Sequence, residues 1–397
     1  MATLTFEQAR RCVLDKASDI GAPRSVENVS LQDAAGRVLA QPVLADRDYP
    51  PTSRSVRDGF AVRAADVPGQ LFVVGEVRAG EAFLRDVQPG QAVEIMTGAP
   101  LPPGTDSVTM VEHVKLQGDR LTVPRHLYLG ENVSPQGSQA RRGDLLLEPG
   151  RRLGFAEIAL LASVGQREVP VFAKPRIAIL ATGDEVVEVN QIPQDYQVRN
   201  SNAESLAVQV ARAGGDPTVL AVARDLYAAT RELIEHGLRF DLLLLSGGVS
   251  AGKYDIVERV LEDLGAEFFF DRVLIMPGQP LVFGKVRNTF FFGLPGNPAS
   301  TMVTFEVFAR AMVERLGGQT ESILPLLWSK LSQDFTQKTG LTRFLPANLN
   351  ADASEVTPVA WQGSGDIPAV ARANAFLVTE PERERWAAGD WIRVLAK

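Results

Sequence analysis

The stretch F-D-L-L-L-L-S-G-G-V-S, residues 240–250, predicts a buried β-strand that runs into a glycine-rich loop. Its four leucines show no polar alternation, which is typical of a strand covered by helices on both faces. A similar stretch, R-I-A-I-L-A-T-G-D-E at 176–185, runs from an apolar strand into a glycine and two carboxylates. Helical patterns follow at 202–213, 225–236 and 254–264, so we expect a parallel, doubly wound α/β sheet.

The sequence on either side of this α/β segment changes to short strands separated by Gly and Pro. Residues 46–140 contain alternating segments of this kind, which indicates a β-rich module. Residues 319–397 return to the same pattern after an α/β segment that we place at 173–318. We therefore expect an α/β multidomain protein, with a central doubly wound sheet domain and β-rich modules before and after it.

Composition excludes several classes of protein. The chain has 397 residues, a formal net charge of −7 and one cysteine, Cys12. The negative charge argues against a general nucleic-acid-binding protein, which usually carries a basic face. No apolar run approaches the ~18 residues of a membrane span, the N-terminus does not resemble a signal peptide, and one cysteine fits a reducing compartment. We expect a cytoplasmic protein that binds neither nucleic acid nor membrane.

Three loops are candidates for a ligand site, because ligands of open α/β sheets bind beyond the carboxyl ends of the strands. One is T-G-D-E at 182–185, and the other two are richer in glycine or proline. In S-G-G-V-S, 246–250, the glycines let N–H groups approach an anion beside a helix N-terminus. In L-P-G-N-P, 294–298, two prolines stiffen a polar loop. An ordinary βα turn and a helix-entry turn are the structural alternatives. The candidate binding residues are Ser246, Gly247, Gly248, Ser250, Pro295, Gly296, Asn297 and Pro298.

Three carboxylates follow strands at the same edge of the predicted sheet. They are Glu185, Asp225 and Asp255. Each alone is explained as a negative charge near a helix N-terminus, where the helix dipole favours it. Together, beside an anion-binding loop, they predict a Mg²⁺ held between the protein and phosphate oxygens.

Taken in order along the chain, these loops and several others resemble the MoeA family of molybdopterin molybdenumtransferases and the related E domain of gephyrin. The resemblance covers almost the whole chain, and the set of motifs is specific although each motif alone is weak. The motifs are D-G-F-A-V (58–62), M-T-G-A-P (96–100), G-E-N-V (130–133), T-G-D-E (182–185), S-G-G-V-S-A-G-K-Y-D (246–255), P-G-Q-P (277–280), L-P-G-N-P (294–298) and G-S-G-D-I (363–367).

The resemblance implies a fold, an assembly and a reaction. Residues 1–45 and 141–172 would form an elongated linker domain, and the central domain would resemble MogA-type adenylyltransferases. The active site would lie in a homodimer, between the α/β domain of one subunit and the β module of the other. The reaction would insert molybdate into adenylylated molybdopterin and release AMP, with Mg²⁺ as cofactor and a MogA-type adenylyltransferase as a partner.

The resemblance also gives roles to residues that, by themselves, lie in ordinary turns. Asp58 and Thr97 would reach the site from the partner subunit. Glu185, Asp225 and Asp255 would handle the metal and the phosphoanhydride, and these five are the expected catalytic residues. Besides the two glycine loops, the expected substrate-binding residues are Lys253, Gln279, Arg343 and Ser364.

The chain departs from the family pattern at three charged positions. The typical K-P-G-K-P is M-P-G-Q-P here, so Met276 and Gln279 replace two lysines. The usual R-G-E-D after G-E-N-V is Q-G-S-Q, so Gln139 replaces an acid. Hydrogen bonds from lysines to oxyanions contribute about 1.5–3 kcal/mol each. Cations expected to compensate are Lys253, Arg272, Arg141 and Arg142.

Three interpretations stay open from these departures. The first is an active molybdenumtransferase with a rearranged anion site. The second is a paralogue that acts on a related pterin nucleotide or on another oxyanion, such as tungstate. The third is a non-catalytic dimeric scaffold of the same fold. A stand-alone adenylyltransferase is a different class, and the flanking β modules argue against it.

Overall fold

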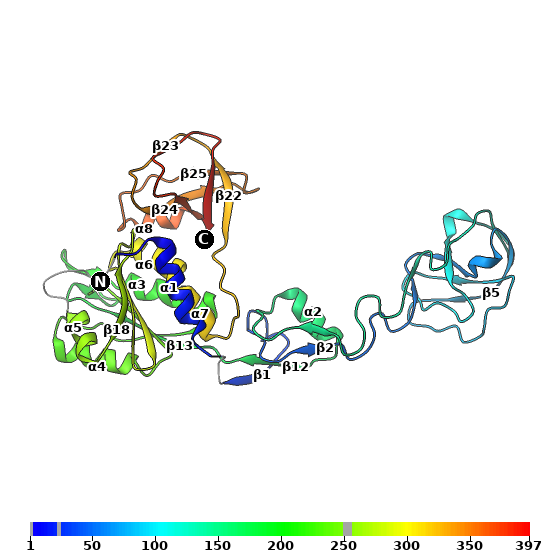
Figure 1. Ribbon diagram of the computed structural model, residues 1–397, viewed down its shortest axis with the longest axis horizontal. Coiled ribbons are helices and arrows are strands. Elements are labelled where there is room, and N and C mark those ends of the chain that lie inside the picture. The colour runs from blue at the N-terminus through cyan, green and yellow to red at the C-terminus, as the bar shows by residue number, and fades with distance from the viewer. Residues whose placement is uncertain (1–2, 22–24, 249–255) are drawn as a thin grey trace.

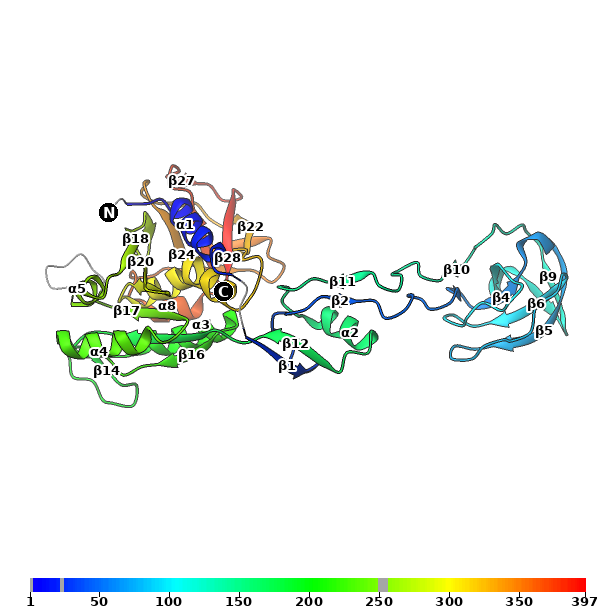
Figure 2. The ribbon, with the colours of Figure 1, turned by 60° about the horizontal axis from the view of Figure 1, so that its bottom comes forward.

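The computed structural model describes residues 3–21, 25–248 and 256–397. The molecule is elongated (Figure 1). The central sheet and the C-terminal module form a compact body at one end, the β module lies at the other end, and a slender linker joins them. Figure 2 shows the same separation from a second direction. Within the described residues, no helix combines the length and the apolar character that crossing a membrane requires.

The central sheet has six strands in the order β16-β13-β17-β21-β20-β18. Every residue of β17 is buried, as the leucine run predicts. The parallel strands are β13 (Arg176–Ala181), β16 (Asp216–Val219), β17 (Leu242–Ser246) and β21 (Thr289–Leu294). β16 ends at Val219. Beyond it, Ala223 forms a single bridge with Thr182.

Helices cover both faces of this sheet, which confirms the doubly wound prediction. Successive side chains of a strand point to opposite faces, so Leu242 and Leu244 pack in one core and Leu243 and Leu245 in the other. The first core includes α1 (Phe6–Ser18), α3 (Ser201–Ala213), α6 (Pro298–Thr304), the π-helix η3 (Phe305–Ala309) and α7 (Arg310–Leu316). The second includes α4 (Tyr227–Gly237) and α5 (Ile256–Asp263).

Two strands of the central sheet are antiparallel, which corrects the expectation of a fully parallel sheet. β20 (Pro280–Val286) pairs with β21 across a turn in which Val286 lies opposite Thr289. A two-residue turn can join only antiparallel strands. β18 (Glu267–Arg272), absent from the sequence-based prediction, pairs antiparallel with β20 at the sheet edge.

The linker is built from two distant parts of the chain. β1 (Val26–Ser30) pairs with β12 (Glu168–Phe172), β2 (Val43–Leu44) pairs with β11 (Leu145–Leu147), and α2 is Phe155–Ser163. Arg152 ties this region to the central domain by donating to Gly36 O at 3.0 Å and Ala213 O at 2.6 Å. α1 belongs to the residues assigned to the linker, yet it packs against the central sheet.

The β module contains a six-stranded sheet in the order β7-β4-β6-β5-β9-β8. The strands are β4 (Gly59–Val62), β5 (Gly69–Val77), β6 (Gln91–Ile95), β7 (Ser107–Met110), β8 (Lys115–Gln117) and β9 (Arg120–Val123). The short 3-10 helices are η1 (Ala64–Asp66) and η2 (Val111–His113), and β3 (Arg54–Ser55) pairs with β10 (Val133–Ser134). Gly59 is required at the start of β4, because a Cβ there would lie 1.8 Å from Thr109 O.

The C-terminal module also contains a six-stranded sheet, in the order β19-β24-β25-β22-β28-β26. Its first strand, β19 (Ile275–Met276), comes from the M-P-G-Q-P region and pairs in parallel with β24 (Thr342–Leu349). The other elements are β22 (Leu326–Leu331), β23 (Phe335–Thr336), β25 (Glu355–Pro358), α8 (Ile367–Arg372), β26 (Ala375–Thr379), β27 (Arg385–Trp386) and β28 (Trp391–Ala396). This pairing holds the opening of the M-P-G-Q-P loop between the two domains.

Candidate functional site

Three loops meet at the carboxyl edge of the central sheet. Thr182 N donates to Ser246 O at 3.0 Å, which joins the loops after β13 and β17. Gly247 N donates to Leu294 O at 3.2 Å, which joins the loops after β17 and β21. The predicted convergence of T-G-D-E, S-G-G and L-P-G-N-P is therefore present in the structure, at the edge where such sheets bind ligands.

Asn202, in the first turn of α3, holds two of these loops together. Its Nδ2 donates to Ser246 Oγ at 2.9 Å and to Gly296 O at 2.7 Å. Asn202 was not among the site residues predicted from the sequence. The stretch N-S-N at 200–202 could have indicated it. Asn200 caps α3 by accepting from Ala203 N at 3.2 Å, so the second asparagine, Asn202, is not needed as the cap and is available for another contact.

The S-G-G loop forms a cradle around Thr182. Gly247 and Gly248 have φ angles of +89° and +64°, which residues other than glycine rarely adopt. A Cβ on Gly248 would lie 2.6 Å from Thr182 Oγ1. Thr182 is buried, and its hydroxyl has no hydrogen-bond partner among the described residues; nor has Asn202 Oδ1. Buried polar atoms are usually paired, so these two atoms suit a polar ligand at the cradle.

The L-P-G-N-P loop leads into α6 with its asparagine side chain available. Pro298 occupies the first turn of the helix, and Asn297 is the N-cap, although its side chain makes no capping hydrogen bond. Thr301 Oγ1 donates to Pro295 O at 2.5 Å and fixes the loop against the helix. A Cβ on Gly296 would lie 3.7 Å from Gly247 Cα, so the two glycine loops pack closely together.

Two of the three predicted metal carboxylates lie in joined loops. Asp184 Oδ1 accepts from Asp225 N at 3.2 Å, and Arg224 Nη1 donates to Asp184 O at 2.9 Å. The Glu185 carboxylate folds back over Gly183, where an added Cβ would lie 2.4 Å from Glu185 Oε2. Within the described part of the chain, no three His, Cys, Asp or Glu side chains are grouped for a metal. Asp255, like Ser250 and Lys253, lies outside the described residues, so the Mg²⁺ set stays a prediction.

Asp58 and Thr97 form a pair in the β module. The N–H and the hydroxyl of Thr97 donate to Asp58 Oδ1 at 2.6 and 2.8 Å. These bonds, the backbone one above all, hold the pKa of the Asp58 carboxyl below its usual value. Their stabilisation is present above the unfolded-state pKa and is lost as the pH falls through the lower folded-state pKa. Both residues adjoin β4 and β6, at the opposite end of the molecule from the glycine loops (Figure 2).

The C-terminal module reaches the site through Ser364 and Arg343. Ser364 O accepts from Ala299 N at 2.9 Å, which places the G-S-G-D-I loop against the start of α6. Arg343 is buried, and its Nε and Nη2 donate to Lys338 O at 3.3 and 3.2 Å. Burial holds the pKa of the Arg343 guanidinium below its usual value.

Met276 is in direct contact with Arg343. The two residues lie opposite each other in the β19–β24 pair, and Arg343 Nη1 donates to Met276 Sδ. Gly278 packs against α6, because a Cβ there would lie 2.4 Å from Thr304 Cγ2. The cation beside position 276 is thus Arg343, which was not among the expected compensating residues. Arg142 lies in the linker, where its backbone N–H donates to Asp48 Oδ1 at 3.0 Å.

We expect Met276→Lys to lower the free energy of unfolding by about 2 kcal/mol, because it places an ammonium against a buried guanidinium without a carboxylate. Met276→Leu is the matched control, since a change between apolar side chains of similar size usually costs under about 1.5 kcal/mol. Urea unfolding of both variants measures the difference. Equal stability of the lysine and leucine variants would contradict the contact.

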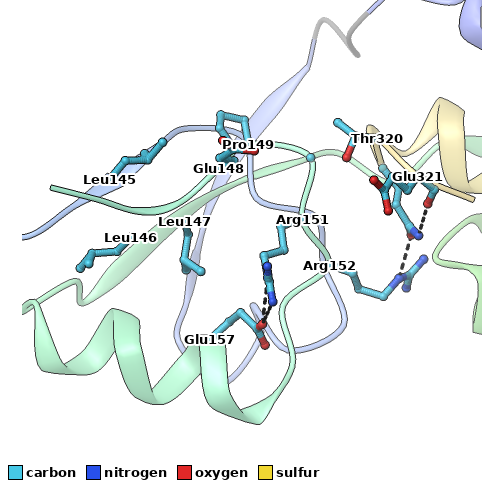
Figure 3. A pocket seen from close by; sticks show the side chains of 12 residues that line it. Leu145, Leu146, Leu147, Glu148, Pro149, Arg151, Arg152, Glu157, Thr320 and Glu321 are labelled. Atoms are coloured by element: carbon cyan, nitrogen blue, oxygen red, sulfur yellow. Dashed lines mark hydrogen bonds and ion pairs between the residues drawn. The ribbon is translucent and has the colours of Figure 1, made fainter. Parts of the chain in front are cut away.

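A cavity of about 590 Å³ lies at the junction of the linker and the central domain (Figure 3). Arg151 pairs with Glu157 at 2.8 Å in this cavity, and Arg152 Nε donates to Gln319 Oε1 at 3.1 Å. Figure 3 shows Arg151 and Arg152 between the apolar side chains Leu145–Leu147 and Glu321. None of the predicted site residues lines it, so its role is separate from the loops described above.

Comparisons with known proteins give the same family over the whole length of the chain. Residues 4–165 match the MoeA N-terminal region (domain I and II), residues 178–343 a probable molybdopterin binding domain, and residues 329–397 the MoeA C-terminal region (domain IV). The molybdopterin molybdenumtransferase of Bacillus subtilis is 33% identical over 388 residues, which cover 93% of this chain and 89% of that protein. The chain belongs to the molybdopterin molybdenumtransferase family.

Further matches agree with this assignment to the molybdopterin molybdenumtransferases. The Haemophilus influenzae molybdopterin molybdenumtransferase is 33% identical over 399 residues, covering 98% of each chain. A crystal structure of the molybdopterin biosynthesis protein MoeA from Pyrococcus horikoshii has a TM-score of 0.83 at 26% identity and covers 100% of both chains. The family resemblance, the α/β multidomain fold class and the assignment as a transferase are confirmed.

Proposed function

We propose that this member of the family inserts molybdenum, supplied as molybdate, into adenylylated molybdopterin and releases AMP. The glycine cradle beside the unpaired Thr182 hydroxyl carries the proposal. Substrate and molybdate are both anions, so the site must offer oriented N–H groups, hydroxyls and cations. Such a reaction depends mostly on positioning and charge neutralisation, with little covalent work for the protein.

The proposed roles divide the site between its loops. The S-G-G loop and Ser250 hold the pterin or its phosphate, with Lys253, and L-P-G-N-P holds the opposite side of the substrate. Gln279, Arg343 and Ser364 contribute from the loop and module that contact α6. A Mg²⁺ on Glu185, Asp225 and Asp255 would neutralise phosphate charge; carboxylate oxygens are ligands that this cation prefers.

We also propose that the working unit is a homodimer, with Asp58 and Thr97 entering the site from the second subunit. The distance between the β module and the glycine loops within one chain supports this (Figure 1). A closed two-fold arrangement repeats the same contact twice and so builds two equal sites. A MogA-type adenylyltransferase is proposed as the enzyme that supplies the adenylylated substrate.

Purified protein with adenylyl-molybdopterin, molybdate and Mg²⁺ is expected to release AMP, and omission of molybdate or chelation of Mg²⁺ should prevent it. Gly248→Val is the matched inactive variant, because its Cβ would meet the Thr182 hydroxyl at 2.6 Å. Chromatographic quantification of AMP measures the reaction. Tight pterin binding without AMP release would favour the scaffold interpretation over catalysis.

A second candidate is the same reaction with another oxyanion. Met276 and Gln279 are neutral where the family pattern has lysines, and Arg343 is the cation beside position 276. Fewer charges alter the balance between anion attraction and desolvation at the site. The same assay with tungstate in place of molybdate distinguishes the two candidates by the anion that supports faster AMP release.

A further inference from the structure

An open cavity of about 310 Å³ lies on the side of the central domain that meets the C-terminal module. Its size falls within the range of small-molecule sites, which often occur at domain interfaces. Helices α3, α6 and α8 lie together in this region and supply much of its wall (Figure 1), and η3, α7, β26 and β28 contribute the remaining lining residues. The residues that line the cavity include Val208, Gln209 and Arg212 of α3, Met302 of α6, Val370 of α8 and Lys397.

The α3 wall combines apolar and polar side chains on one helical face. Val208, Gln209 and Arg212 are spaced to face the same side of the helix, and Val208 is 61% exposed although it is apolar. Opposite it, Met302, Val370 and Phe376 bring apolar surface from three further elements. The cavity therefore offers an apolar interior that no described side chain of the chain fills.

Gln209 leaves one acceptor unused beside this cavity. Its Nε2 donates to Met302 O at 3.1 Å and to Glu306 Oε1 at 2.8 Å, which fixes the orientation of the amide. Its Oε1 is buried without a hydrogen-bond partner among the described residues. Glu306 lies in the π-helix η3, and π-helical turns are frequent at functional sites.

Two cations at the rim of the cavity have no acidic partner among the residues that the structure describes. Within the described residues, Arg212 makes no ion pair or hydrogen bond, and Lys397 Nζ donates only to Val370 O, at 2.7 Å. Burial, and after it the charge of Arg212, holds the pKa of the Lys397 ammonium below its usual value. The other two charged residues of the lining, Arg310 and Glu306, are paired with each other at 3.5 Å, and Arg310 also contacts Glu314 at 2.8 Å.

We propose that this cavity binds a small organic anion with an apolar body, such as an aromatic sulfonate or carboxylate. The anionic group would lie between Arg212 and Lys397, and the apolar body against Val208 and Met302. This site is independent of the proposed function. Its wall nevertheless includes α3, α6 and α8. Asn202 lies in the first turn of α3, α6 follows L-P-G-N-P, and α8 begins at the end of G-S-G-D-I. The same three helices therefore border both this cavity and the proposed substrate site.

Fluorescence titration with 1-anilinonaphthalene-8-sulfonate tests the proposal. The full-length protein is expected to bind the probe saturably, and Val208→Trp, which fills the cavity, should weaken binding at least about tenfold. Arg212→Glu should weaken it about tenfold through charge reversal at the rim. Arg11→Glu, an exposed reversal on α1 outside the cavity, is the matched control and should leave the affinity unchanged.

A neutral probe separates anion recognition from simple apolar burial. N-phenyl-1-naphthylamine has the same aromatic body without the sulfonate, and is expected to bind at least about tenfold more weakly. Equal affinity for both probes would overturn the anion site. Unchanged sulfonate binding in folded Val208→Trp would overturn the location. If that variant does not fold by circular dichroism, unchanged binding by Arg212→Glu overturns the proposal instead.

Discussion

Replacement of Asn202 by aspartate is expected to lower kcat/KM for AMP release by about 100-fold, since misplacing a catalytic loop by about 1 Å has an effect of that size. The amide donates to both Ser246 Oγ and Gly296 O. Aspartate keeps the shape but is only an acceptor when ionised, so the bond to Gly296 O is lost, its charge faces that carbonyl oxygen, and Ser246 can be held only if its hydroxyl turns to donate. The S-G-G and L-P-G-N-P loops would then lose their common anchor.

The stability of the same variant separates positioning from unfolding. We expect the free energy of unfolding to fall by about 1–3 kcal/mol, the usual cost of leaving buried polar groups unpaired, so the variant should still be folded at assay temperature. Glu204→Gln, an exposed change in the same turn of α3, is the matched control and should keep full activity. Activity of Asn202→Asp within threefold of the parent would show that the anchor is dispensable.

Local patterns in the sequence were sufficient to predict the parallel strands of the central sheet and the loops that follow them, but not its antiparallel edge. A run such as L-L-L-L followed by S-G-G predicts a strand that is buried on both faces and ends in a tight turn. Both properties depend only on residues that are neighbours in the sequence. The capacity of Leu242–Leu245 to pack in two cores is a consequence of strand geometry. The three loops could therefore be assigned to one sheet edge before any contact was known.

Contacts between distant segments could not be predicted in this way. Asn202 bonds to residues 44 and 94 positions away, and the unpaired Thr182 hydroxyl lies beside Gly248, on a loop far from it in the sequence. From the sequence, Met276 indicated a missing positive charge, whereas the structure places it against Arg343, 67 positions away. Local charge counting missed that cation because β19 leaves the central domain to pair with β24.

Mixing two inactive variants is expected to restore activity if the site is shared between subunits. Asp58→Ala would remove a residue that one subunit lends, and Asn202→Asp would damage the loops that the other subunit provides. After subunit exchange, about half the dimers are mixed, and each mixed dimer has one site with neither change. The mixture should therefore recover about a quarter of parental AMP release, far above either variant alone.

The control for this experiment uses two changes on the same side of the shared site. Asp58 and Thr97 form one hydrogen-bonded pair in the β module, so mixing Asp58→Ala with Thr97→Ala leaves every site damaged and should restore nothing. A site built within one chain predicts no recovery in either mixture, because each chain then carries its own defect. Recovery only in the first mixture requires that the β module of one subunit serves the glycine loops of the other. That outcome would also explain why a single chain holds the two halves of its site at opposite ends (Figure 1).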